Sequence, residues 1–181
     1  MLTITIPASE MFNDETQEFV KVCSEQTIQL EHSLVSLSKW ESKWCKPFLS
    51  GKEITLEETI DYIKCMTITQ NVDPDVYTRL SRSNINEINK YIEAPMTATT
   101  FYNDPQKGTS KEIITSELIY YWMISLNIPM ECQKWHLNRL LTLIRVCNIK
   151  NAPAKKMSKG DITRRNAALN AARKKQMGTR G

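Results

Sequence analysis

Three segments within residues 1–31 alternate between apolar and polar side chains, which is the pattern of half-buried β-strands. Residues 2–6 read Leu-Thr-Ile-Thr-Ile, and the alternation returns in residues 18–23 and 26–31. The two-residue link Ser24-Glu25 separates the last two segments, although it lacks the Gly or Asn that tight hairpins favour. We expect a small N-terminal antiparallel β-sheet that includes a hairpin around this link.

The period becomes helical after residue 32. Large apolar side chains recur on one stripe: Leu37, Trp40, Trp44 and Phe48. The opposite stripe is polar and contains Ser36, Lys39, Lys43 and Lys46. This spacing predicts an amphipathic helix. Pro47 ends it at about Lys46, because proline cannot continue a helix.

Capping residues predict further helices in the middle of the chain. Thr55 and Glu58 have the spacing of a capping box in front of residues 56–66. Asp73-Pro74 is an N-cap followed by proline at the first helical position, and this helix runs to about Leu80.

The pattern continues to residue 147. Ser83 is expected to cap a short helix that Ala94-Pro95 ends, and residues 96–101 have a strand-like composition. Residues 103–110 are rich in turn formers. Two longer helices are then expected, one from Thr115 to Leu126 and one over about Pro129–Cys147.

Charge divides the chain into two parts. Residues 1–149 hold 14 Lys and Arg against 19 Asp and Glu, whereas residues 150–181 hold 10 Lys and Arg against Asp161 alone. We therefore predict a mainly α (α+β) fold. Its globular domain covers 1–150, with the sheet in 1–31 and a compact set of helices in 32–150. A basic, partly helical C-terminal tail covers 151–181.

Composition excludes several classes of protein. The five glycines form neither of the common phosphate-binding loops, so nucleotide binding by those routes is excluded. The five cysteines are widely spaced, without C-x-x-C, and fit reduced thiols in a cytosolic protein. The N-terminus lacks the pattern of a signal peptide, and no apolar run approaches the ~20 residues that span a bilayer. We therefore expect no membrane contact.

Few residues have the spacing of a catalytic or metal site. Cys132 and His136, four residues apart, are the strongest pair, but two ligands do not complete a zinc site. We interpret them as a buried thiol and a packed histidine. Glu57, Glu58 and Asp61 share the first turns of a helix, where acids favour the cap and the helix dipole. We predict no catalytic residue, metal or cofactor.

Trp40 and Trp44 are the main candidates for protein binding in the first 150 residues. Tryptophans one helical turn apart either pack in a core or form the centre of an interface. The aromatic cluster Tyr120–Met123 has the same two interpretations, and the sequence leaves both open.

The basic tail has three interpretations. Its main cations are Arg164, Arg165, Arg173, Lys174 and Lys175. They fit a solvated segment, a segment that docks on an acidic protein surface, or an arm that binds nucleic acid. No known nucleic-acid-binding motif accompanies them.

Several segments resemble a protein family encoded in the tail-morphogenesis region of long-tailed bacteriophages. They are Leu30-Glu-His-Ser-Leu-Val-Ser-Leu-Ser-Lys-Trp-Glu-Ser-Lys-Trp44 with Pro47-Phe48, Met96-Thr-Ala-Thr-Thr-Phe101, Trp135-His-Leu-Asn-Arg-Leu-Leu-Thr-Leu-Ile144, and Arg165-Asn-Ala-Ala-Leu-Asn170 with Gly178-Thr-Arg-Gly181. The resemblance implies a tail assembly chaperone or a closely associated tail protein. Such a chaperone is a non-enzymatic helical protein of the host cytoplasm. It masks the apolar helices of the tape-measure protein until tail-tube subunits polymerise around them.

From this resemblance we expect the partner to be the tape-measure or tail-tube protein, contacted through Trp40, Trp44 and the basic tail. The sequence leaves open whether the chain forms a homo-oligomer. One alternative is a structural protein of the virion, in the tail or at the head–tail junction. A second is a nucleic-acid-binding protein that acts through the basic tail.

Overall fold

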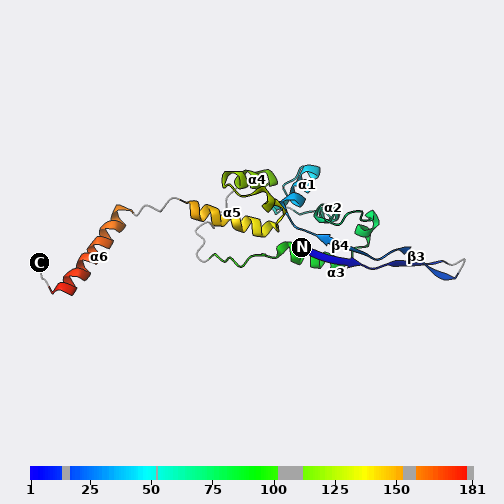
Figure 1. Ribbon diagram of the computed structural model, residues 1–181, viewed down its shortest axis with the longest axis horizontal. Coiled ribbons are helices and arrows are strands. Elements are labelled where there is room, and N and C mark those ends of the chain that lie inside the picture. Colours follow the sequence, from blue (N-terminus) through cyan, green and yellow to red (C-terminus); the bar gives the residue numbers. More distant parts are fainter. Residues whose placement is uncertain (14–16, 52, 102–111, 153–157, 179–181) are drawn as a thin grey trace. The chain divides into compact units, whose positions relative to one another are not determined.

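Figure 1 shows the computed structural model of the chain, which describes residues 1–13, 17–51, 53–101, 112–152 and 158–178. Two compact units make up the chain, Met1–Asn148 and Ile149–Gly181. The described residues are mainly helical, with a small amount of antiparallel β-structure at the N-terminus, as the sequence predicts.

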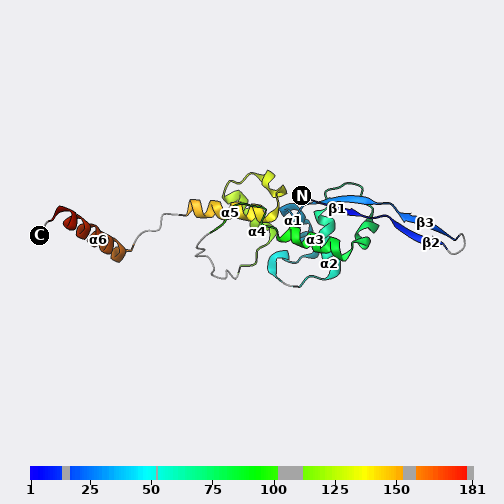
Figure 2. The same cartoon turned by 90° about the horizontal axis from the view of Figure 1, so that it is seen from below.

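The β-structure consists of two strand pairs. Strand β1 (Leu2–Ile6) pairs with β4 (Gln26–Leu30), and β2 (Ser9–Asn13) pairs with β3 (Glu18–Cys23), both antiparallel. The β2–β3 pair extends away from the helices in both views (Figures 1 and 2). The chain therefore reverses between β2 and β3.

The predicted hairpin around Ser24-Glu25 is wrong, because β3 and β4 follow each other without pairing. Burial explains the observed pairing. Ile4 and Ile6 of β1 and Ile28 and Leu30 of β4 are all at most 3% exposed, so pairing β1 with β4 places both apolar stripes on the same core.

Helix α1 (Leu34–Trp44) begins with a capping box in which Ser33 is the N-cap and Ser36 is the third helical residue. Ser36 is therefore buried, although the stripe pattern placed it with the lysines. The helix ends at Trp44, two residues earlier than expected, because Cys45 adopts a left-handed backbone conformation with φ 51°.

The remaining helices follow the capping signals closely. The α-helices are α2 (Leu56–Met66), α3 (Arg82–Glu93), α4 (Ser116–Ser125), α5 (Leu137–Asn151) and α6 (Lys159–Met177). The short 3-10 helices are η1 (Phe48–Ser50), η2 (Pro74–Arg79) and η3 (Met130–Lys134). The capping box of Thr55 and Glu58, the Asp73 cap and the start of α4 at Thr115 are confirmed.

Three expectations in this region need correction. Ser81, not Ser83, caps α3, because Asn84 completes its capping box. Residues 96–101 form no strand. The helix expected from Pro129 is interrupted, because Trp135 and His136 are extended and α5 begins only at Leu137. The loop expected over 103–110 lies outside the described residues.

Two clusters of buried side chains form the core of the first unit. The first joins β1, β4, α2, η2 and α3 and includes Trp40, whereas the second joins α4, η3 and α5 and includes Leu34 and Leu37. Helix α1 therefore supplies buried residues to both clusters. Phe48 packs against both as well, with its ring stacked on Tyr62 at a centroid distance of 4.0 Å.

This packing predicts that Trp40→Ala lowers the free energy of unfolding by about 4 kcal/mol, because it empties a large site in the first cluster. Chemical denaturation measures the loss. The matched control is Tyr121→Ala, which removes an aromatic ring that is 64% exposed and is expected to cost within about 0.5 kcal/mol. Equal effects of the two substitutions would contradict the assignment of Trp40 to the core.

Candidate functional site

The Trp40 side chain belongs to the core and not to a binding surface. It is 2% exposed, its ring lies 5.1 Å from that of Phe48 between centroids, and its indole N–H donates to the Glu58 carbonyl oxygen at 2.9 Å. The expectation that Trp40 contacts a partner therefore does not fit the structure. Because the Trp40 ring is buried and its N–H is already hydrogen-bonded, neither is available for contact with a partner.

Trp44 lies at the edge of the same cluster and is partly buried. Its indole N–H donates to Asp61 Oδ2 at 2.9 Å, and the ammonium groups of Lys43 and Lys46 lie 5.7 and 5.8 Å from its ring centroid. Trp44 thus joins the last turn of α1 to α2 through polar contacts.

The carboxylates of α2 are structural. Lys46 forms an ion pair with Glu58, which also accepts the backbone N–H of Thr55, and these hydrogen bonds lower the pKa of Glu58. Burial alone would raise the pKa of Asp61, but hydrogen bonds from Lys43 and Trp44 outweigh it and the pKa is lowered. Both groups are therefore ionised partners of lysines. The capping interpretation holds for Glu58.

Glu41 is the buried carboxylate that the sequence pattern did not reveal. It is 7% exposed and lies in the last turns of α1. Its Oε1 accepts the backbone N–H of Phe48 at 2.9 Å, and its Oε2 accepts that of Ser116, at the start of α4, at 2.7 Å. Glu41 therefore caps α4 from another helix, where the helix dipole favours a negative charge.

The two histidines of the chain meet inside the first unit. Their rings are 5.1 Å apart between centroids, and the side chains are 2% and 6% exposed for His32 and His136. The backbone joins them as well, because Ser33 and His136 form a β-bridge and Leu137 N–H donates to the His32 carbonyl at 2.7 Å. These contacts explain why His136 lies in an extended stretch before α5 and not within a helix.

Both rings have hydrogen-bond partners, and the partners of His136 fix its tautomer. His136 Nδ1 accepts the backbone N–H of Asn138, so its Nε2 carries the proton and donates to the Tyr91 carbonyl at 3.0 Å. The Tyr62 hydroxyl shares a hydrogen bond with His32 Nδ1 at 2.6 Å, and burial raises the pKa of Tyr62. Burial, aided by repulsion from His136, lowers the pKa of His32 to about 4, and burial also lowers that of His136.

The cysteines do not join these groups into a reactive site. Cys132 is buried in the second core cluster, as expected for a packed thiol, and Cys45 is exposed at the opposite end of α1 from His32. Among the described residues, no group of three or more His, Cys, Asp or Glu side chains has the arrangement of a metal site. No helix in that part of the chain is long and apolar enough to span a bilayer.

Helix α4 exposes large apolar side chains on the first unit. Its sequence, Ser-Glu-Leu-Ile-Tyr-Tyr-Trp-Met-Ile-Ser, is apolar on nearly every side. Ile119 and Met123 are fully buried, whereas Tyr121 and Ile124 are 64% and 67% exposed. Of the cluster Tyr120–Met123, the structure thus buries Met123 and leaves Tyr121 exposed. A helix that is apolar all round normally buries more of its surface than α4 does.

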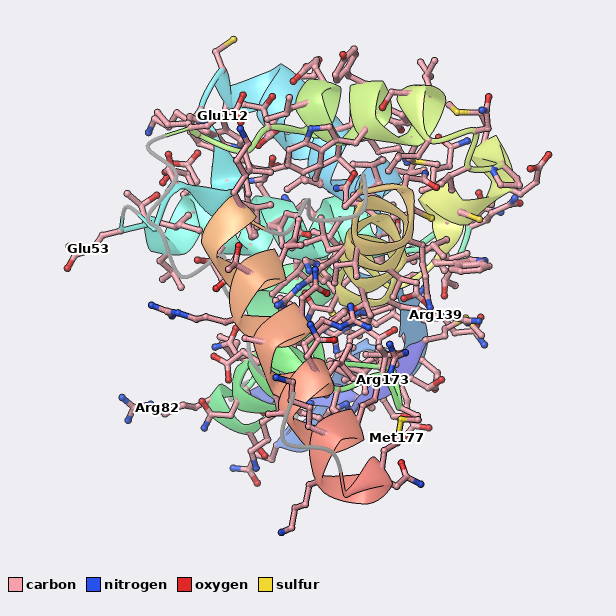
Figure 3. The ribbon with its side chains drawn as sticks, turned by 90° about the vertical axis from the view of Figure 1, so that its left-hand side faces the viewer. Glu53, Arg82, Glu112, Arg139, Arg173 and Met177 are labelled. Carbon is pink, nitrogen blue, oxygen red and sulfur yellow. The ribbon has the colours of Figure 1, made fainter. Side chains whose placement is uncertain are left out.

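The predicted basic residues of the tail all lie on α6. Arg164, Arg165, Arg173, Lys174 and Lys175 are exposed, as is every residue from Lys159 to Met177. The side chains of Arg173 and Met177 project from this helix in Figure 3. The structure therefore brings these five cations together on one helix and gives that helix no core.

Comparisons with protein-family models, with curated proteins and with solved structures found no match to the chain.

We predict that Glu41→Ala lowers the free energy of unfolding by about 3 kcal/mol, because it leaves the buried backbone N–H of Ser116 and the partly buried one of Phe48 without an acceptor. Glu41→Gln keeps one acceptor oxygen and is expected to cost less. The control is Glu87→Ala on the exposed side of α3, with a change within about 0.5 kcal/mol. Denaturant titration would contradict the capping role if Glu41→Ala and Glu87→Ala behaved alike.

The histidine pair predicts a loss of stability in mild acid. In the unfolded chain His32 binds a proton below the ordinary histidine pKa of 6.5, whereas in the folded protein its pKa of about 4 keeps it neutral in mild acid. The contribution of neutral His32 to the free energy of unfolding is therefore fully present above pH 6.5 and is lost as the pH falls toward 4. Between pH 7 and pH 5, His32 alone accounts for about 2 kcal/mol.

The measurement is the free energy of unfolding of the wild type and of His32→Gln at pH 7 and pH 5. The variant should start less stable but lose less between the two pH values. The remaining dependence then comes from His136 and from carboxyl groups such as Glu58 and Asp61, whose pKa values are lowered in the folded state. An identical loss in both proteins would show that His32 does not titrate in this way.

Proposed function

We propose that the chain is a non-enzymatic bacteriophage tail-assembly protein, a chaperone or adaptor that binds the tape-measure or tail-tube protein. The proposal is supported by the resemblance of residues 30–48, 96–101 and 135–144, together with the last residues of the tail, to proteins of the tail-morphogenesis region. Its site of action is the host cytoplasm. Phage tail proteins with apolar helices need a partner surface that is itself apolar, and the first unit offers one.

The exposed face of α4 carries the proposal. Tyr121 and Ile124 are three residues apart, so they lie on the same side of the helix, opposite the buried Ile119 and Met123. Ile113, just before the helix, is 56% exposed. An amphipathic helix of the partner could bury these side chains in the manner of other helix-docking surfaces. This surface replaces Trp40 as the apolar part of the binding site.

The tail is a second surface, which is charged and not apolar. Arg164, Arg165, Arg173, Lys174 and Lys175 concentrate positive charge on α6, which suits an anionic ligand. Trp44 stays a candidate at the edge of the first core cluster, next to Lys43 and Lys46.

Co-expression with the tape-measure protein of the same phage tests the proposal. The wild type is expected to co-purify with it, and Tyr121→Ser/Ile124→Ser is expected to lose at least about tenfold in affinity, which corresponds to ~1.4 kcal/mol. The matched control is Leu56→Ser/Ile68→Ser, which removes side chains that are 67% and 51% exposed elsewhere on the first unit.

The double variants should keep the melting temperature of the wild type, because both remove exposed side chains. Retained binding by Tyr121→Ser/Ile124→Ser would remove α4 from the interface, and no binding by the wild type would contradict the adaptor function. Mass spectrometry of purified virions separates the two phage functions. A chaperone is absent from the virion, and a structural tail protein is present in fixed stoichiometry.

A further inference from the structure

Helix α6 is capped at both ends although its residues are exposed on every side. Ser158 accepts the backbone N–H of Asp161 at 3.1 Å and also contacts its carboxylate, and Gly178 closes the C-terminus with φ 64°. Most helices in proteins are stabilised by packing an apolar face, but every residue of α6 is exposed. The helix is therefore specified by its caps and its local propensity, and it contributes no buried residue.

The cations of α6 surround the helix axis. Arg164 and Arg173 are nine residues apart, which at 100° per residue places them on opposite sides of the helix, and about 13 Å apart along it. Arg165 and Lys174 have the same separation. A flat acidic protein surface meets one side of a helix only, so it would leave half of these cations unused. A groove with anionic walls on both sides would use most of them.

One stripe of α6 carries polar side chains of the kinds that can hydrogen-bond to the edges of DNA bases. Thr163, Asn166, Asn170 and Arg173 recur every three or four residues and therefore share one face. Asparagine and arginine are the side chains that read adenine and guanine in the major groove of DNA. Residues 166–172 include four alanines and no charged residue. The helix therefore has a small diameter between its two groups of cations.

We propose that α6 binds duplex DNA in the major groove, with the Thr163–Arg173 stripe toward the base edges and the flanking cations toward the phosphates. The major groove, ≈12 Å wide, admits one α-helix between its two phosphate walls. The deep, narrow major groove of duplex RNA does not, so DNA is the expected ligand. The inference rests on α6 alone and does not depend on the partner of α4.

Fluorescence anisotropy with the full-length chain and a labelled 20-base-pair duplex of mixed sequence tests the proposal. Binding is expected at 50 mM salt and should weaken steeply as salt rises. Arg164→Gln/Lys174→Gln/Lys175→Gln should reduce the slope of log affinity against log salt by about 2.7, which is 0.9 for each lost phosphate contact. The control is Arg82→Gln/Lys90→Gln, which changes two exposed cations of α3, where Arg82 projects outward (Figure 3), and the slope of this variant should equal that of the wild type.

A second measurement tests the stripe. Selection of duplexes from a pool with ten random base pairs should enrich a sequence with the wild type but not with Asn166→Ala/Asn170→Ala. The melting temperature of the first unit should stay constant in all these variants, because α6 contributes no buried residue.

Three outcomes would overturn the inference. The first is no duplex binding at 50 mM salt, and the second is binding that the triple glutamine variant retains in full. The third is binding to polyglutamate in preference to DNA, which would show that α6 docks on acidic protein instead. These outcomes leave the α4 experiment untouched, so the two proposals fail separately.

Discussion

The burial of α1 between two hydrophobic clusters is the constraint on which the rest of the first unit depends. Trp40 faces the cluster of β1, β4, α2 and α3, whereas Leu34 and Leu37 face the cluster of α4 and α5. Because one short helix supplies buried residues to both clusters, most of its apolar side chains are buried within the first unit. Of the two tryptophans, Trp40 therefore packs in the core, whereas the partly buried Trp44 lies at the edge of the first cluster.

Charged side chains hold the elements around α1 in place. Glu41 reaches the start of α4, Lys46 pairs with Glu58 and Lys43 pairs with Asp61, so each of these buried carboxylates has a specific donor. A buried carboxylate that lost its donors would cost several kcal/mol, which makes these contacts selective for one arrangement of α1, α2 and α4. Glu41, Glu58 and Asp61 thus position the elements around α1.

Local signals predicted much of the fold, and contacts between distant residues account for what they missed. Strand β1, the capping box of Thr55, and α4 and α6 follow from short-range spacing and propensity. The pairing of β1 with β4, the late start of α5 and the role of Glu41 depend on partners far along the chain. Glu41 contacts Ser116, 75 residues away, and no periodicity in one sequence reports such a pair.

The candidate site could likewise be predicted only in part from the sequence. The expectation that Trp40 contacts a partner does not fit the structure, because a helical stripe does not reveal whether it faces the core of its own chain or another protein. The positions of the tail cations around the helix axis could be derived only once the bounds of α6 were known.

The first unit is thus built around α1, and we propose that α6, which lies in the second unit, binds duplex DNA. Hydrogen–deuterium exchange of the full-length chain, with and without duplex DNA, tests this separation directly. We expect the amides of residues 34–44 to exchange slowest and to be unaffected by DNA, while residues 159–177 exchange fast alone and become protected when DNA is added. Protection that appears in residues 34–48 and not in 159–177 would contradict it.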